Sequence, residues 1–357
     1  MIITISKTAT NDERAQLMML LSRIMGRQRP MATLHMREHD VIALDLPLDI
    51  ATETILKQQK AVDTIHTLKT PYQLVSRAFQ QEDTSILIGA TSDSAPVTLG
   101  GSSAFPVIMA GPCAVEHREQ LLEAARGVKA AGAHMLRGGA YKPRTSPYQF
   151  QGLGIEGLRL LAEARAETGL PIITEVMEPA LVETVAEYAD VLQIGARNVQ
   201  NFPLLQAAGR NSKRLPVVLK RGWSSTIEEW LSAAEYIVAA GNPNVILCER
   251  GIRSYDPQTR NVLDLTCVPL LHELTHLPVI VDPSHATGKR SLVPPVSRAS
   301  IAAGAQGLII EVHPDPAHAL CDGKQSITPA ELQKVVREAN MLTEMIKGDI
   351  PQLTPVM

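Results

Sequence analysis

The sequence predicts a (β/α)8 barrel preceded by a small α+β domain with the ferredoxin-like order of elements. Eight short runs rich in β-branched residues lie between residues 106 and 313, and helix-like stretches separate most of them. Continuous apolar strands that alternate with helices indicate a parallel sheet buried on both faces. Eight such units in roughly 250 residues are typical of a closed barrel. The runs are PVIMAGPC, HMLRGG, PIITEV, VLQIGAR, PVVLKRG, NVILCERG, PVIVDPSH and GLIIEVH.

Residues 1–68 predict the smaller domain. MIITIS alternates like a strand, and NDERAQLMMLLSRIMGR predicts a helix with Thr10 or Asn11 as its N-cap and Glu13 in its first turn. PMATLHMRE and DVIALDL predict two strands, IATETILKQQKA a second helix, and VDTIHTL a last strand. The order βαββαβ is the ferredoxin-like plan.

The remaining chain divides into a linker and the catalytic barrel. Residues 69–100 predict the linker, because the stretch is polar and turn-rich near TSDSAP and Gly100, although PYQLVSRAF is apolar enough to pack on a neighbour. The barrel is assigned to residues 101–350. TPAELQKVVREANMLTEMI predicts its closing helix, with Thr328 as N-cap and Pro329 as the first helical residue.

Composition excludes several classes of protein. The net charge of −3 gives no reason to expect nucleic acid or an anionic membrane as a partner, and an aromatic content of 3% disfavours a base-stacking platform. No apolar run reaches the roughly 18 residues that a membrane span needs, and no secretory signal is visible. Four cysteines in 357 residues do not make a disulfide framework. We expect a cytoplasmic protein.

Two short motifs match known functional patterns but lie in the wrong context. GLGIEG at residues 152–157 matches the dinucleotide fingerprint, but the loop-like TSPYQFQ rather than a strand precedes it. HELTH at residues 272–276 matches a zinc-binding helix motif, yet it ends the helix before PVIVDPSH, on the barrel face away from the predicted chemistry. We assign neither nucleotide nor zinc binding to them.

The eight predicted strands each end in a residue that can bind a metal or a phosphate. In a (β/α)8 barrel the carboxyl ends of the strands form the active site. The residues supplied there are Cys113, Arg137, Glu175, Arg197, Lys220, Arg250, His285 and Glu311.

Metal-binding residue types follow the first, seventh and eighth strands. Cys113, His285 and Glu311 end these strands, and Asp322 lies in the next loop. The set is less soft than a four-cysteine zinc site and is not all-oxygen like a Mg2+ site. It suits one divalent ion per subunit, namely Mn2+, Fe2+, Co2+ or Zn2+. Cys321 adjoins Asp322 and could form a disulfide with Cys113 under oxidation, which would remove a ligand.

Cations form the second predicted group at the strand ends. They are Arg137, Lys142, Arg144, Arg197, Lys220, Arg221 and Arg250. This density indicates a ligand with more than one anionic group, because arginine binds phosphate and carboxylate through two hydrogen bonds and lysine acts as a point charge. Prolines stiffen the segment Lys142–Pro143–Arg144–Thr145–Ser146–Pro147, which favours an anion cradle. We expect one or two of the seven to pair with Glu175, Glu249 or Asp282 instead.

These motifs carry a resemblance to a known family. They are AGPCAVE, LRGGAYKPRTSPYQFQGLG, TEVM, QIGARNVQNF, LKRG, ILCERGIRSYDPQTRN, VDPSHATGKR and EVHPDP…ALCDGKQS, and together they cover essentially all of residues 106–327. The chain resembles the 3-deoxy-D-arabino-heptulosonate 7-phosphate (DAHP) synthases, in particular their type I beta branch. Residues 1–68 are similar in element order to the regulatory ferredoxin-like domain that some members carry before the barrel.

The resemblance implies condensation of phosphoenolpyruvate with D-erythrose 4-phosphate, the first step of the shikimate pathway to aromatic amino acids. It implies that the metal ligands are Cys113, His285, Glu311 and Asp322. The residues implied to bind phosphoenolpyruvate are Arg137, Lys142, Arg197, Lys220 and Arg250. Those implied to bind erythrose 4-phosphate are Lys142, Pro143, Arg144 and Thr145. The metal ligands His285 and Asp322 are also implied to contact substrate. We predict that Lys142 transfers a proton to the new hydroxyl and that Glu175 acts near the water. Cys113 and His285 are counted as catalytic through the metal.

The resemblance also favours a homotetramer. Residues 1–68 are compact and poor in site residues, so we predict that they mediate feedback inhibition by tyrosine or phenylalanine.

Three alternatives remain open. A 3-deoxy-D-manno-octulosonate 8-phosphate synthase would use arabinose 5-phosphate, but these enzymes have an Asn-Arg-Ser-Ser type sequence where this chain has Pro143–Arg144–Thr145–Ser146. A catalytically silent regulatory protein would not need intact ligands and cations. An N-terminal chorismate mutase would be all-helical, which the alternating strands MIITIS and DVIALDL contradict.

Overall fold

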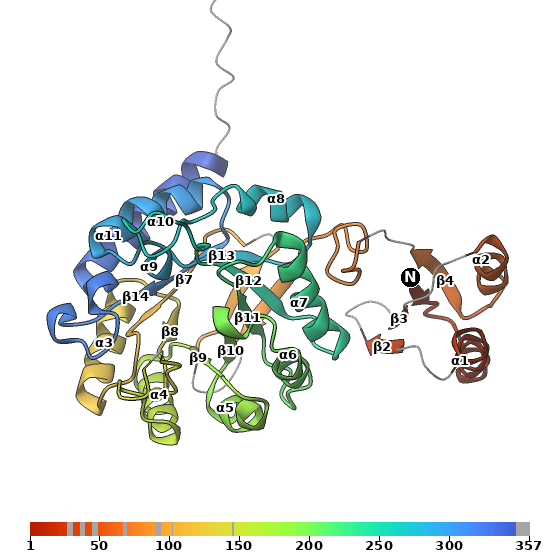
Figure 1. Cartoon of the computed structure of the whole chain (residues 1–357), viewed down its shortest axis with the longest axis horizontal. Coiled ribbons are helices and arrows are strands. Elements are labelled where there is room, and N and C mark those ends of the chain that lie inside the picture. The colour runs from red at the N-terminus through yellow and green to blue at the C-terminus, as the bar shows by residue number, and fades with distance from the viewer. Residues whose placement is uncertain are drawn as a thin grey trace, which may run out of the picture.

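The structure, a computed structural model, describes residues 1–26, 31–35, 40–44, 49–66, 70–89, 94–101, 103–144 and 146–347. Its larger part is a closed barrel of eight parallel strands in chain order (Figure 1). The eight predicted strands are confirmed. They are β7 (Val107–Gly111), β8 (Met135–Arg137), β9 (Ile172–Glu175), β10 (Val191–Ile194), β11 (Val217–Lys220), β12 (Val245–Glu249), β13 (Val279–Val281) and β14 (Gly307–Glu311).

Helices surround the ring of strands, so every strand is buried on both faces (Figure 1). The helices are α3 (Arg118–Ala130), α4 (Ile155–Thr168), α5 (Val182–Tyr188), α6 (Phe202–Gly209), α7 (Ile227–Ala239), α8 (Cys267–Leu274), α9 (Pro283–Thr287), α10 (Val293–Ala302) and α11 (Pro329–Lys347). The predicted closing helix is α11. The Thr328 hydroxyl accepts from the Glu331 N–H, and the Glu331 carboxylate accepts from the Thr328 N–H, so the predicted N-cap is confirmed.

The N-terminal part has the predicted ferredoxin-like order. Its elements are β1 (Ile2–Ile5), α1 (Asn11–Met25), β2 (Met31–His35), β3 (Asp40–Leu44), α2 (Ile50–Lys57) and β4 (Val62–His66), and its antiparallel sheet runs β2-β3-β1-β4. Thr10 is the N-cap of α1 and forms a capping box with Glu13.

The two faces of this N-terminal sheet bury side chains in different cores. Ile3 and Ile42 pack with the buried side chains of α1 and α2. Ile2, Leu34 and Val41 join the large apolar cluster of the barrel, and β2 lies against α7. Because alternate residues of a strand face opposite sides of the sheet, one face of the small sheet packs on its own helices. The other face lies toward the outer helices of the barrel (Figure 1).

The segment predicted as a linker contains a two-stranded antiparallel sheet formed by β5 (Ser85–Ile88) and β6 (Val97–Gly100). Ile86, Ile88 and Leu99 pack with the inward-facing barrel side chains, so the hairpin plugs the amino-terminal end of the barrel. Gly100 adopts a φ of +83°, and a Cβ there would lie 2.3 Å from the Thr84 carbonyl oxygen. A glycine is therefore required where the hairpin meets the barrel.

The two histidines of the HELTH motif make separate hydrogen bonds to the surrounding chain, and those of His276 fix the connector. The Nε2 of His276 donates to the Leu74 carbonyl at 2.8 Å, and its Nδ1 accepts from the Thr84 hydroxyl at 2.6 Å. His272 contacts the Gly304 carbonyl. The two imidazoles are used separately, as expected for the face opposite the predicted active site. Across the part of the chain that the structure describes, no helix is long and apolar enough to cross a membrane.

Candidate active site

The carboxyl ends of the barrel strands surround one pocket of about 750 Å3. Most of the side chains predicted from the strand ends line it. The lining includes Arg137, Lys142, Pro143, Arg144, Glu175, Arg197, Lys220, Arg250, His285 and Asp322. Thr145, predicted to bind substrate, lies outside the described residues.

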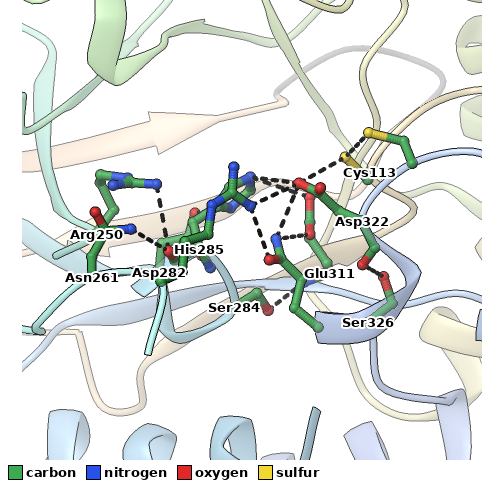
Figure 2. A network of polar contacts seen from close by, with 12 residues as sticks. Cys113, Arg250, Asn261, Asp282, Ser284, His285, Glu311, Asp322 and Ser326 are labelled. Atoms are coloured by element: carbon green, nitrogen blue, oxygen red, sulfur yellow. Dashed lines mark hydrogen bonds and ion pairs between the residues drawn. The ribbon is translucent and has the colours of Figure 1, made fainter. Parts of the chain in front are cut away.

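The four predicted metal ligands fall into two groups that share Asp322, one with His285 and Glu311 and the other with Cys113 and Cys321 (Figure 2). Of the four, His285 and Asp322 line the pocket, whereas Cys113 and Glu311 lie behind its lining. The Nε2 of His285 is 3.4 Å from Glu311 Oε1 and 3.8 Å from Asp322 Oδ2. The Sγ of Cys113 lies 3.7 Å from Asp322 Oδ2. Asp322 is shared by both contacts, and it adopts a left-handed backbone with a φ of +52°, which is uncommon outside glycine.

His285 is oriented for metal binding by a carboxylate behind it. Its Nδ1 donates to Asp282 Oδ2 at 2.7 Å, which fixes the tautomer and leaves the Nε2 lone pair facing Glu311 and Asp322. Burial lowers the pKa of His285, whereas Asp282 and Glu311 act to raise it. Although burial opposes ionisation, His285 and Lys220 hold the pKa of Asp282 well below its usual range.

Glu311 is ionised in the same environment. Burial alone would raise its pKa, but His285, Arg137 and Lys142 lower it to about 2. Arg137 Nη1 lies 2.9 Å from Glu311 Oε1. A thiol, a neutral imidazole and carboxylates facing one another fit a borderline divalent ion. The four residues can therefore hold the predicted metal.

The predicted cations divide into those that reach the pocket and one that does not. Arg221 donates to Glu249 at 3.1 Å and to Asp264 at 2.9 Å and does not line the pocket, so its role is structural. Lys220 lines the pocket but also pairs with Asp282 at 2.5 Å. The expectation that one or two cations would pair with Glu249 or Asp282 agrees with this geometry.

Comparison with known proteins identifies the family. The sequence profile of the DAHP synthetase I family matches residues 82–348. The chain belongs to the DAHP synthetase I family. A phospho-2-dehydro-3-deoxyheptonate aldolase of Thermotoga maritima is 50% identical over 285 residues, which are 80% of this chain and 81% of that protein. A 2-dehydro-3-deoxyphosphooctonate aldolase of Syntrophotalea carbinolica is 34% identical over 274 residues, 71% of this chain and 96% of that one.

Solved structures agree with this family assignment. The crystal structure of the phospho-2-dehydro-3-deoxyheptonate aldolase (DAHP synthase) of Thermotoga maritima matches with a TM-score of 0.73 at 43% identity, and the match covers 97% of each chain. A truncated form of the synthase from the same organism matches with a TM-score of 0.69 at 47% identity, covering 77% of this chain and 98% of that one. The first of these matches extends over nearly the whole length of this DAHP synthetase I family member.

In this family member, Lys142 reaches the pocket from the loop after β8. Its Nζ donates to the Cys113 carbonyl at 3.0 Å, and a Cβ at Gly139 would lie 2.6 Å from its Cδ. Burial opposes its charge, but the facing groups Cys113 and Cys321 raise its pKa above the ordinary value. Lys142 is therefore an ammonium that can donate a proton.

Glu175 lies across the same pocket at the end of β9. Its Oε2 accepts from Gln193 Nε2 at 3.3 Å, and among the described residues its buried Oε1 has no hydrogen-bond partner. Because Glu175 lines the pocket, this unsatisfied carboxylate is a candidate partner for a water or a substrate hydroxyl.

Three residues at this site were not predicted. Arg260 lines the pocket and donates to Asp322 Oδ2 at 3.1 Å, and Trp223 lies near the guanidinium groups of Arg197 and Arg250. Gln325 contacts two predicted metal ligands. Arg260 and Gln325 belong to the motifs PQTRN and CDGKQS, but neither ends a strand, so the strand-end pattern does not select them.

Proposed function

We propose that this chain catalyses the metal-dependent condensation of phosphoenolpyruvate with D-erythrose 4-phosphate and water, giving DAHP and phosphate. One observation carries the proposal. His285 and Asp322, which belong to the two groups of candidate ligands that also contain Glu311 and Cys113, line a pocket whose other walls carry cations. A metal beside several fixed positive charges suits a reaction between two phosphorylated substrates. Family membership and the similarity to the Thermotoga maritima enzyme support the same reaction.

The bound divalent ion, Mn2+, Fe2+, Co2+ or Zn2+, would polarise the aldehyde oxygen of erythrose 4-phosphate. Cys113, His285, Glu311 and Asp322 would hold it. Asp282 keeps His285 in the required tautomer through the bond to Nδ1.

Different cations are proposed to bind the two anionic substrates. We assign Arg137, Lys142, Arg197, Lys220 and Arg250 to the phosphate and carboxylate of phosphoenolpyruvate. Arg144, Pro143 and Thr145 belong to the sugar phosphate site, together with Lys142. Arg137 and Lys220 already pair with Glu311 and Asp282, so they hold their positions before substrate arrives. Such preorganised charge stabilises anions without reorganisation during the reaction.

Proton transfers balance the reaction. The C3 carbon of phosphoenolpyruvate forms a bond to the aldehyde carbon, and Lys142 donates a proton to the new hydroxyl oxygen. A water adds to C2 and gives a proton to Glu175. As the C2–O bond breaks, phosphate leaves with the bridging oxygen and takes the remaining proton of the former water, whose oxygen becomes the ketone oxygen. The position of both residues in the lining of the pocket supports these roles.

Phosphate release tests the proposal. The full chain is assayed with phosphoenolpyruvate and either erythrose 4-phosphate or arabinose 5-phosphate, with Mn2+ or with a chelator. We expect metal-dependent turnover with the four-carbon sugar only. Turnover with arabinose 5-phosphate alone would assign the chain to the octulosonate reaction, which is that named for the Syntrophotalea carbinolica relative. Absence of turnover with either sugar would favour a silent homologue.

The N-terminal part is proposed as the regulatory domain, with tyrosine or phenylalanine as its effector. Two observations support this proposal: the domain has its own core, and its sheet packs on α7 of the barrel. A ligand that shifts the sheet would therefore also change its contact with α7. The chain is also proposed to be a cytoplasmic homotetramer. Light scattering of the purified protein tests the tetramer.

A further inference from the structure

Gln325 is a buried amide that contacts two predicted metal ligands at once. It ends the 3-10 turn η5 (Gly323–Gln325), and the residue is 3% exposed. Its Nε2 lies 2.5 Å from Glu311 Oε2 and 3.2 Å from Asp322 Oδ2. Its Oε1 accepts from Arg260 Nη1 at 2.9 Å. Carboxylates only accept and a guanidinium only donates, so these partners fix which end of the amide is which.

The side-chain amide of Gln325 bridges two carboxylates that belong to separate elements of the fold. Glu311 ends β14, whereas Asp322 lies in the following loop with a left-handed backbone. Two carboxylates in a poorly solvated site repel each other, and an amide nitrogen that donates one proton to each offsets this repulsion. The bond to Glu311 Oε2 leaves Oε1 facing His285 Nε2, at 3.4 Å.

Arg260 holds the other end of the amide. It donates to Gln325 and also to Asp322 Oδ2, at 3.1 Å, so the amide cannot rotate without losing a charged partner. Gln325 thus has one orientation, and it presents both carboxylates toward the wall that carries His285 and Cys113.

We infer that Gln325 is a positioning residue for the divalent ion, one that presets Glu311 and Asp322 in the geometry that binds it. The inference rests on the proposed function, since it assumes that these carboxylates are metal ligands. Outer partners of metal ligands typically contribute roughly 10- to 100-fold to metal affinity.

The test compares Gln325→Leu and Gln325→Asn with Gln306→Leu in the full chain. Gln306 is a matched control, because its Oε1 accepts from the Val279 N–H at 2.9 Å, outside the metal group. Mn2+ and Co2+ affinities are measured by calorimetry, and the thiolate-to-Co2+ absorption band reports the coordination geometry. Gln325→Leu is expected to weaken binding by roughly 10- to 100-fold and to alter the band. Gln325→Asn keeps the donors but shortens their reach, so an intermediate loss is expected.

Turnover at saturating Mn2+ provides a second readout. We expect the Gln325 variants to recover most of their activity when metal is in excess. Gln306→Leu should be fully active without excess metal. Wild-type affinity and an unchanged cobalt band in both Gln325 variants would overturn the inference while leaving the proposed function intact. A wild-type chain that binds neither ion would instead overturn the proposed function. If Gln325→Leu does not fold, Gln325→Asn decides alone.

Discussion

The sulfur atoms of Cys113 and Cys321 lie 3.0 Å apart, and both residues are free thiols. One of them is a proposed metal ligand, and the other adjoins Asp322. Coupling of these two thiols would remove a proposed ligand from the metal. The side chain of Arg144 also contacts Cys321, which places this pair beside the sugar phosphate site.

We expect metal-free protein treated with hydrogen peroxide to lose the activity that later addition of Mn2+ would restore, as Cys113 and Cys321 form a disulfide. The two thiols lose two electrons and two protons, and peroxide is reduced to two waters. Dithiothreitol should restore activity, and bound Mn2+ should slow the loss by occupying Cys113. Activity and free thiols are followed together. Cys321→Ser, which cannot form the pair, is expected to resist reversible inactivation, and equal sensitivity of this variant would contradict the mechanism.

Cys113→Ser is expected to weaken metal binding strongly. A hydroxyl is a poorer ligand than a thiolate for a borderline ion, so the loss should exceed the roughly 10- to 100-fold typical of outer partners. Calorimetry with Mn2+ measures it. Cys321→Ser serves as the control, because it changes the neighbouring sulfur and leaves the four proposed ligands in place. Near-normal turnover of Cys113→Ser with stoichiometric metal would refute its assignment.

Lys142→Met is expected to lower kcat by roughly 10^2- to 10^4-fold, the range for loss of a general acid. The buried ammonium also balances the charge of nearby groups, so unfolding of each variant is checked first. Lys142→Arg keeps the charge but donates poorly, because guanidinium holds its proton more firmly. If arginine restored kcat as well as substrate affinity, Lys142 would act through charge alone.

Acid is expected to loosen the connector through His276. Burial lowers the pKa of His276 to about 4 from 6.5, so the unfolded chain takes up a proton before the folded one does. The lowered pKa adds about 3 kcal/mol to the free energy of unfolding above pH 6.5. This contribution is lost as the pH falls towards 4. Urea unfolding at several pH values measures the loss. His276→Asn should show a shallower dependence between pH 6.5 and 4 than the unaltered chain.

Removal of residues 1–68 is expected to leave an active enzyme that tyrosine and phenylalanine no longer inhibit. The connector should stay in place, because Glu235 of α7 accepts from the Leu74 and Val75 N–H groups and His276 holds Thr84. The truncated synthase of Thermotoga maritima is a precedent for such a shortened chain. Inhibition constants of the full and shortened chains are compared. Equal inhibition of both would exclude a regulatory role for the domain.

Periodicity predicted the barrel well because each buried strand is a continuous apolar run bounded by residues that the active site uses. Val217–Lys220, for example, is apolar until the lysine that enters the pocket. The hairpin plug was missed because its apolar side chains are buried by contacts with distant barrel strands, which no local pattern shows. Gln325 was missed for a related reason: its importance arises from its three partners, and no local pattern encodes them.

The hairpin at the amino-terminal end of the barrel protects the interior of the fold from water. Ile86, Ile88 and Leu99 cover inward-facing strand side chains such as Met109 and Ile246. Without this cover, apolar side chains at that end of the barrel would face solvent. A short β-hairpin therefore helps to stabilise the scaffold that carries the pocket, at the opposite end of the fold from the chemistry.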